Sequence, residues 1–179
     1  MQSRTGRRLV AVIALGAMGL ALAHAAGAAM LKIDWRTFGF PNTVAQLIIE
    51  PDQAADVTLG DTRVQIPAGA FGAHPARFTL LMGQNSFFQP YAPSGQRVIA
   101  SFAFEVVDLI TGEQILKFQK PVVYNLTRPE VSAQSAYWDT TPSAPPHVLK
   151  NPFPARFTDH TLTHGNIGAP VGWLVTSPQ

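Results

Sequence analysis

The sequence predicts an all-β protein, built as a single antiparallel β-sandwich that follows an amino-terminal signal peptide. Three observations support this prediction. Short stretches that alternate apolar and polar residues recur at roughly ten-residue spacing, which is typical of a sandwich. The 15 prolines and 14 glycines interrupt the chain too often for long helices. Residues 1–28 are first basic, then apolar, then rich in small residues, which is the order of an export signal.

The signal peptide accounts for residues 1–28. Its basic residues are Arg4, Arg7 and Arg8, and an apolar run follows from Leu9 to Ala23. Small residues at alternate positions then favour cleavage after Ala25 or Ala28. Because the run is short and alanine-rich, as in bacterial signals, we expect a periplasmic or secreted protein.

An uncleaved membrane anchor is the alternative reading of this segment. Residues 9–31 are about long enough to cross a bilayer, which takes roughly 20 residues. We favour cleavage because the second half of the segment is alanine and glycine with His24 among them. Contact with a membrane is expected only if the signal is retained.

The charge of the remaining chain excludes several classes of partner. Three of the 13 basic residues lie in the signal, which leaves 10 against 11 acidic residues in residues 29–179. A near-neutral domain has no field that would hold nucleic acid. The chain also has no cysteine, so disulfides, thiolate metal sites and cysteine nucleophiles are excluded. No cofactor is expected, and the sequence leaves the oligomeric state open.

The first four strands are expected where β-forming residues alternate between turn residues. They are Val44–Ile49, Val57–Leu59, Thr62–Ile66 and Ala76–Met82.

The clearest strand is Arg97–Val107, because Val98, Ala100, Phe102, Phe104 and Val106 recur with a period of two. Its other face carries Ser101 and Glu105, so we expect that side of the strand to be partly wet.

A turn over Asp108–Glu113 leads into a return strand from Gln114 through Phe118 and past Pro121 to Leu126. Later strands are expected at Ser135–Trp138, Ala155–Leu162 and Val171–Val175, with a proline-rich connection over Asp139–Pro146. Since these strands are too few to bury a core alone, residues 127–179 are interpreted as an extension that completes the same sandwich.

The stretch Val64-Gln65-Ile66-Pro67-Ala68-Gly69-Ala70-Phe71 resembles the turn that opens the ZU-type β-sandwich domain of netrin receptors, ankyrins and tight-junction scaffolds. The pair Pro121-Val122, which follows a long strand, is similar to a later strand of that family. The resemblance covers about Asp56 to Leu126 and implies a ZU-like or immunoglobulin-like sandwich. It also implies a protein-interaction module that is not an enzyme. Whether or not the resemblance reflects common ancestry, Pro67 should end the strand Thr62–Ile66 and Gly69 should supply a positive φ at the corner.

Motifs of known catalytic sites are missing from the sequence. It contains no nucleophile elbow, no His-Glu-x-x-His pair, no phosphate loop and no dinucleotide fingerprint. We therefore expect a protein that is not an enzyme. A glycan-acting enzyme with a carboxylate site formed only by the fold remains an alternative.

Histidines provide a second alternative, a periplasmic metal-binding protein. The candidate ligands are His74, His147, His160 and His164. His160 and His164 are four residues apart, but this segment is expected to be a strand, on which four residues span about 13 Å. Two ligands of one zinc ion each lie about 2 Å from it, so the primary expectation is no metal site.

Aromatic residues in the segment from Gln84 to Gln96 are the preferred candidates for binding. Phe87, Phe88 and Tyr91 lie among turn-forming residues between two strands, and Trp138 ends a later strand. Aromatic side chains on a loop of a rigid scaffold can stack on sugars or anchor a partner. They can also fold back and cover the core. The sequence therefore predicts an exported, non-catalytic β-sandwich module that binds a protein or a cell-envelope component.

Overall fold

The computed structural model describes residues 32–140, 148–150, 155–169 and 171–179. The chain separates into two units, Met1–Lys32 and Ile33–Gln179, and the second is the folded domain described below. The predicted signal peptide and His147 lie outside the described residues.

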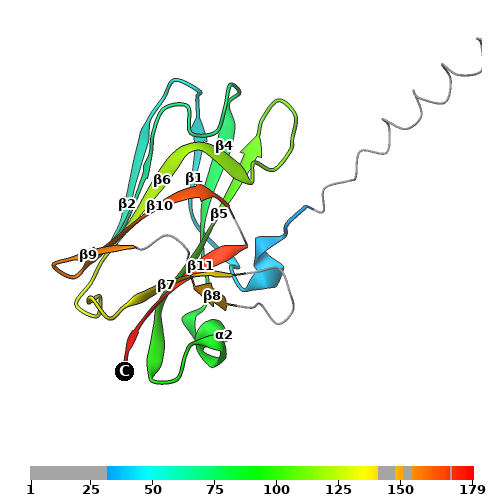
Figure 1. Ribbon diagram of the computed structural model, residues 1–179. Coiled ribbons are helices and arrows are strands. Elements are labelled where there is room, and N and C mark those ends of the chain that lie inside the picture. Colours follow the sequence, from blue (N-terminus) through cyan, green and yellow to red (C-terminus); the bar gives the residue numbers. More distant parts are fainter. Residues whose placement is uncertain (1–31, 141–147, 151–154, 170) are drawn as a thin grey trace, which may run out of the picture. The chain divides into compact units, whose positions relative to one another are not determined.

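Within the described residues, eleven strands form two antiparallel sheets, which confirms the predicted all-β sandwich (Figure 1). The six-stranded sheet has the order β1-β4-β5-β11-β7-β8, and the five-stranded sheet has the order β2-β3-β6-β10-β9. The strands of the first sheet are β1 (Asn42–Ile49), β4 (Ala76–Met82), β5 (Gln96–Asp108), β7 (Ala136–Thr140), β8 (Val148–Lys150) and β11 (Gly172–Pro178). Those of the second are β2 (Ala55–Leu59), β3 (Thr62–Ile66), β6 (Lys117–Thr127), β9 (Arg156–Thr158) and β10 (Thr161–Gly168).

Three short helices complete the described structure. They are η1 (Trp35–Phe38), α2 (Asn85–Phe88) and η2 (Gln89–Tyr91). The segment from Gln84 to Gln96, expected from sequence to be a loop, therefore contains one turn of α-helix and one of 3₁₀-helix.

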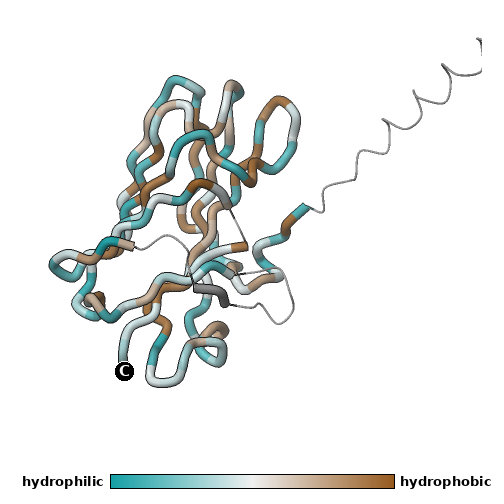
Figure 2. Tube along the Cα trace, viewed as in Figure 1, coloured by the Kyte–Doolittle hydropathy of each residue, from teal (hydrophilic) through white to brown (hydrophobic). Residues whose placement is uncertain are grey.

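The main core lies between the two sheets and is rich in aromatic side chains. Phe102 of β5 stacks on Tyr124 of β6 with ring centroids 3.6 Å apart, and Trp173 of β11 lies 5.2 Å from Phe102. The strands supply these side chains because successive residues point to opposite faces. Figure 2 shows the resulting alternation of hydrophobic and hydrophilic residues along the strands.

Part of the outer face of the six-stranded sheet is also covered, which corrects the expectation of a partly wet face for Ser101 but not for Glu105, which is half-buried. Ser101 is 1% exposed and donates a hydrogen bond to Oδ1 of Asn85 at 2.8 Å. Phe88 of α2 packs 5.0 Å from Phe40, and both rings are fully buried. Alternation alone could not show this cover, because it comes from α2 and Phe40, which lie outside the strand.

The predicted strand Ala155–Leu162 is wrong, because the structure has a hairpin there. β9 and β10 pair directly, Thr158 with Thr161, around a two-residue turn of Asp159 and His160. Both turn residues have positive φ, 43° and 61°, as a type I′ turn requires. The usual Asn-Gly signal of such a turn is missing here. The alternation of apolar and polar residues therefore predicts one strand that continues through Asp159 and His160.

Two other turns agree with the sequence. The Gly112 amide donates to the Asp108 carbonyl at 2.9 Å, which closes the predicted turn after β5. Gly69 has a φ of +75°, as expected for the corner after β3.

The outer face of the five-stranded sheet is polar. Thr163 donates to Oδ1 of Asn125 at 2.7 Å, and Thr127 and Thr161 share a hydrogen bond of 2.9 Å between their hydroxyls. This is the solvent-facing side of the sandwich.

Candidate functional site

The helical segment α2–η2 places the three predicted aromatic residues side by side but with very different exposure. Phe88 is fully buried, Phe87 is 42% exposed and Tyr91 is half-buried. The structure therefore corrects the prediction for Phe88, whose ring covers the core and is not presented to a partner. Phe87 is one of the few large apolar side chains that the described surface exposes.

Phe87 and Tyr91 form what we call the aromatic surface. Their ring centroids lie 6.5 Å apart, and the ring of Phe87 stands edge-on to that of Phe88 at 5.0 Å and 87°. Such edge-to-face pairs are a favoured arrangement of aromatic rings. The buried ring of Phe88 thus packs against the exposed ring of Phe87 on the side that faces the sheet.

Two glycines allow the aromatic segment to approach the sheet this closely. A Cβ on Gly39 would lie 2.6 Å from the Phe87 ring, and one on Gly83 would lie 2.8 Å from the Phe88 ring. Both distances are shorter than real contacts, so only glycine fits. Gly39 also has a φ of +95° at the end of η1.

Hydrogen bonds fix the segment to β5 at both ends. Asn85 accepts from the Ser101 hydroxyl, as noted above. The Gln89 side chain accepts from the Val98 amide at 2.8 Å and donates to the Gln96 carbonyl at 3.0 Å. The aromatic surface is therefore presented on a fixed platform, which lowers the entropic cost of binding.

Trp138 does not belong to the aromatic segment. It lies half-buried on β7, where it is paired with Leu174 of β11. Its indole N–H donates to the Thr176 hydroxyl at 2.9 Å. The polar end of Trp138 is therefore engaged within its own sheet.

The described histidines lie in three different environments. His74 contacts the Asp108 carboxylate at 2.8 Å, and Nδ1 of His160 lies 3.1 Å from the Val131 carbonyl. His164 is 6% exposed and stacks on Tyr137 between the sheets. Within the described ranges, no group of three His, Asp or Glu side chains is arranged to hold a metal ion.

Three of the described carboxylates have shifted pKa values, each with its own cause. Asp56 pairs with Arg63 at 2.5 Å, and the hydrogen bond from Arg63 lowers the pKa of Asp56. The Thr111 amide and His74 lower the pKa of Asp108 to about 2. Burial raises the pKa of Asp139, and a hydrogen bond from Trp173 opposes that rise.

A pocket of about 290 Å³ lies at another place on the domain. It is lined by Val131, Ser132, Ala133, Phe157, Thr158, Asp159 and His160. Sequence reasoning missed it because it joins the segment after β6 to the turn between β9 and β10. The only local signal was the pair Asp159-His160 between two runs of β-forming residues.

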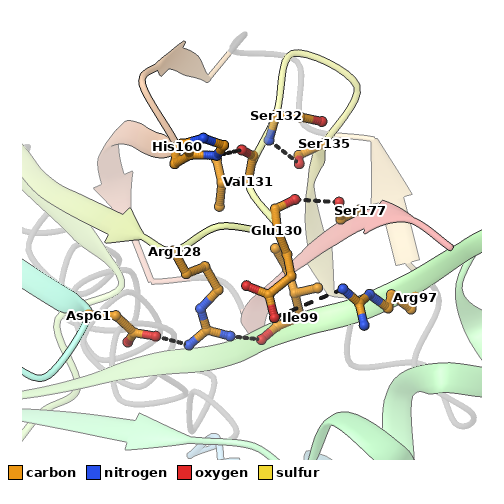
Figure 3. A network of polar contacts seen from close by, with 10 residues as sticks. All are labelled: Asp61, Arg97, Ile99, Arg128, Glu130, Val131, Ser132, Ser135, His160 and Ser177. Carbon is orange, nitrogen blue, oxygen red and sulfur yellow. Dashed lines mark hydrogen bonds and ion pairs between the residues drawn. The ribbon is translucent and has the colours of Figure 1, made fainter.

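Polar contacts hold the segment after β6 in place (Figure 3). Arg128 bonds both the Asp61 carboxylate and the Ile99 carbonyl, and its amide donates to the His160 carbonyl at 3.0 Å. The Ser177 hydroxyl donates to the Glu130 carbonyl at 2.5 Å. These bonds connect the rim of the pocket to both sheets.

In the part of the chain that the structure describes, no helix is both long and apolar enough to cross a membrane. Comparison of the chain with models of known protein families and with curated proteins found no match.

Proposed function

We propose that this protein is an exported, non-catalytic β-sandwich module that binds a protein or a cell-envelope component through its aromatic surface. The observation that carries the proposal is the 42% exposure of Phe87 on a segment whose neighbouring ring is fully buried. Contiguous exposed apolar area often marks an interaction site, and here the ring of Phe87 adjoins that of Tyr91 at 6.5 Å on a fixed segment.

The chemistry of the surface limits the partner. The aromatic surface offers two ring faces and one hydroxyl, and neither of its residues carries a charge. Such a surface fits the apolar face of a sugar ring or an apolar side chain of a protein. Near-neutral charge of residues 29–179 is in keeping with an uncharged recognition surface.

The binding experiment compares Phe87→Ala and Tyr91→Ala with the parent chain. The probe is the isolated envelope fraction of the cells that produce the protein, and bound protein is measured by co-sedimentation. Each substitution should weaken binding by roughly tenfold or more, as for the central residues of interfaces. The melting temperature should stay near that of the parent, since Phe87 is exposed and Tyr91 half-buried.

Two further variants separate binding from folding. Ile110→Ala removes an apolar side chain that is 69% exposed on the turn after β5, and it should bind normally. Phe88→Ala removes a buried ring, which should cost about 3–5 kcal/mol of stability. If Phe87→Ala and Tyr91→Ala bind as the parent does, the aromatic surface is not the binding site.

A further inference from the structure

The four edge strands of the two sheets differ in how they are protected from pairing with another chain. Natural edge strands are usually short, charged or interrupted by proline, which prevents association. β2 has five residues and contains Asp56, and β9 has three and contains Arg156. β8 also has three residues, and Lys150 is one of them.

β1 is the exception among these four edges. It has eight residues, Asn42–Ile49, with no charge and no proline. Val44 is 41% exposed and Ile48 is 62% exposed. On one side β1 pairs with β4, and among the described residues no strand pairs with its other side.

A register shift between Thr43 and Ala45 marks the beginning of β1. A bulge there disturbs the ladder locally and leaves Ala45–Ile49 as the regular part of the edge. On the free side of this part every second residue presents an unpaired backbone N–H and C=O, because the residues between them bond β4. Five residues match the usual length of a strand. The regular part is therefore long enough to accept one more strand.

We propose that β1 pairs antiparallel with β1 of a second copy of this chain and joins the two six-stranded sheets into one. In a twofold pairing each strand meets itself, so a charge close to the axis lies beside the same charge of its copy, which is destabilising. Since β1 carries none, it is the edge best suited to self-pairing. The near-neutral charge of residues 29–179 adds no long-range repulsion.

The symmetry of this pairing fixes one further feature. Residues directly opposite each other in an antiparallel pair point to the same face, so they differ by an even number when the two strands are identical. The twofold axis must therefore pass midway between one residue of β1 and the same residue of the copy. One side chain among those of Ala45–Ile49 faces its own copy.

The first test measures the molecular mass of the full chain, as purified, by sedimentation over a range of concentrations. A dimer is expected, with a Kd that Ile48→Lys raises by roughly tenfold or more. Ile167→Lys makes the same change at a side chain that is 52% exposed on β10, an inner strand of the other sheet, and should leave the Kd unchanged. A monomer at every concentration, or equal effects of the two lysines, would overturn the proposal.

Crosslinking provides a second test that does not depend on a loss of association. Because the chain has no cysteine, a single introduced cysteine is its only thiol. Cysteines placed one at a time at the five positions from Ala45 to Ile49 are oxidised mildly. One position should form a covalent dimer, since a disulfide needs Cα atoms about 4.4–6.8 Å apart. If none of the five crosslinks more than Ile110→Cys does, β1 does not face its copy.

Discussion

His164 is a polar residue that the fold places between the sheets. Its ring stacks on Tyr137 at 4.3 Å, and Tyr137 donates to Oδ1 of Asn166 at 2.9 Å. Burial lowers the pKa of His164 to about 4 and raises the pKa of Tyr137. Both shifts have the same cause, since a charge on either ring would lose its hydration.

Stability should therefore depend on pH through His164. Its pKa is about 4 when folded, against an ordinary value of 6.5, so between these values the unfolded chain binds the proton more readily. The free energy of unfolding should be constant above pH 6.5 and fall toward pH 4, by at most about 1.4 kcal/mol per pH unit. Urea denaturation across this range measures it.

His164→Gln is the control for this pH dependence, because glutamine does not titrate. Asp139 contributes with the opposite sign, since its raised pKa favours the folded state at low pH. Asp108, with a pKa of about 2, acts only in more acidic solution. An unchanged pH profile in His164→Gln would show that another group is responsible.

Among the elements, β5 is enclosed on both edges and on both faces. It pairs with β4 on one side and β11 on the other, and it contacts the core between the sheets and the cover formed by α2. Gly172 of β11 lies under the same cover. The side chain of Trp173 points into the core, so a side chain at the neighbouring Gly172 would point to the outer face. A Cβ there would lie 2.3 Å from the Phe40 ring.

Gly172→Ala should lower the free energy of unfolding by about 1–3 kcal/mol, as added atoms do in closely packed sites. The Phe40 ring is fully buried and the Phe102 carbonyl oxygen lies 2.9 Å from the same Cβ position, so neither can move away at little cost. Gly165→Ala on β10 is the matched control, because its nearest atom is 3.3 Å away. Equal stability of the two variants would mean that the cover is loosely packed.

Considered as a whole molecule, the protein divides its charge unevenly along the chain. All charges of residues 1–28 are positive, and residues 29–179 are close to neutral. If this segment is a cleaved export signal, the protein recovered from the periplasm or the medium should begin at Ala26 or Ala29. Amino-terminal sequencing measures this directly. A start at Met1 would contradict cleavage and favour a membrane anchor.

Sequence alone predicted the sandwich and most strands, because the period of two is a local signal that turns interrupt. It could not decide between Phe87 and Phe88, which are neighbours of the same type and differ only in what packs over them. It also missed the turn at Asp159 and His160, since non-glycine residues seldom adopt positive φ. The resemblance to the ZU-type domain and the identity of the partner stay predictions.

The position of β11 affects when the domain can fold. β11 is the last of the described strands along the chain, yet it lies between β5 and β7 and carries Trp173 into the main core. Until the ribosome has added residues 172–178, β5 lacks its second neighbour and the core lacks one of its largest rings. Folding must therefore wait until nearly the whole domain has been synthesised. If residues 1–28 direct export, a chain that completes its core this late has time to reach the membrane before it folds.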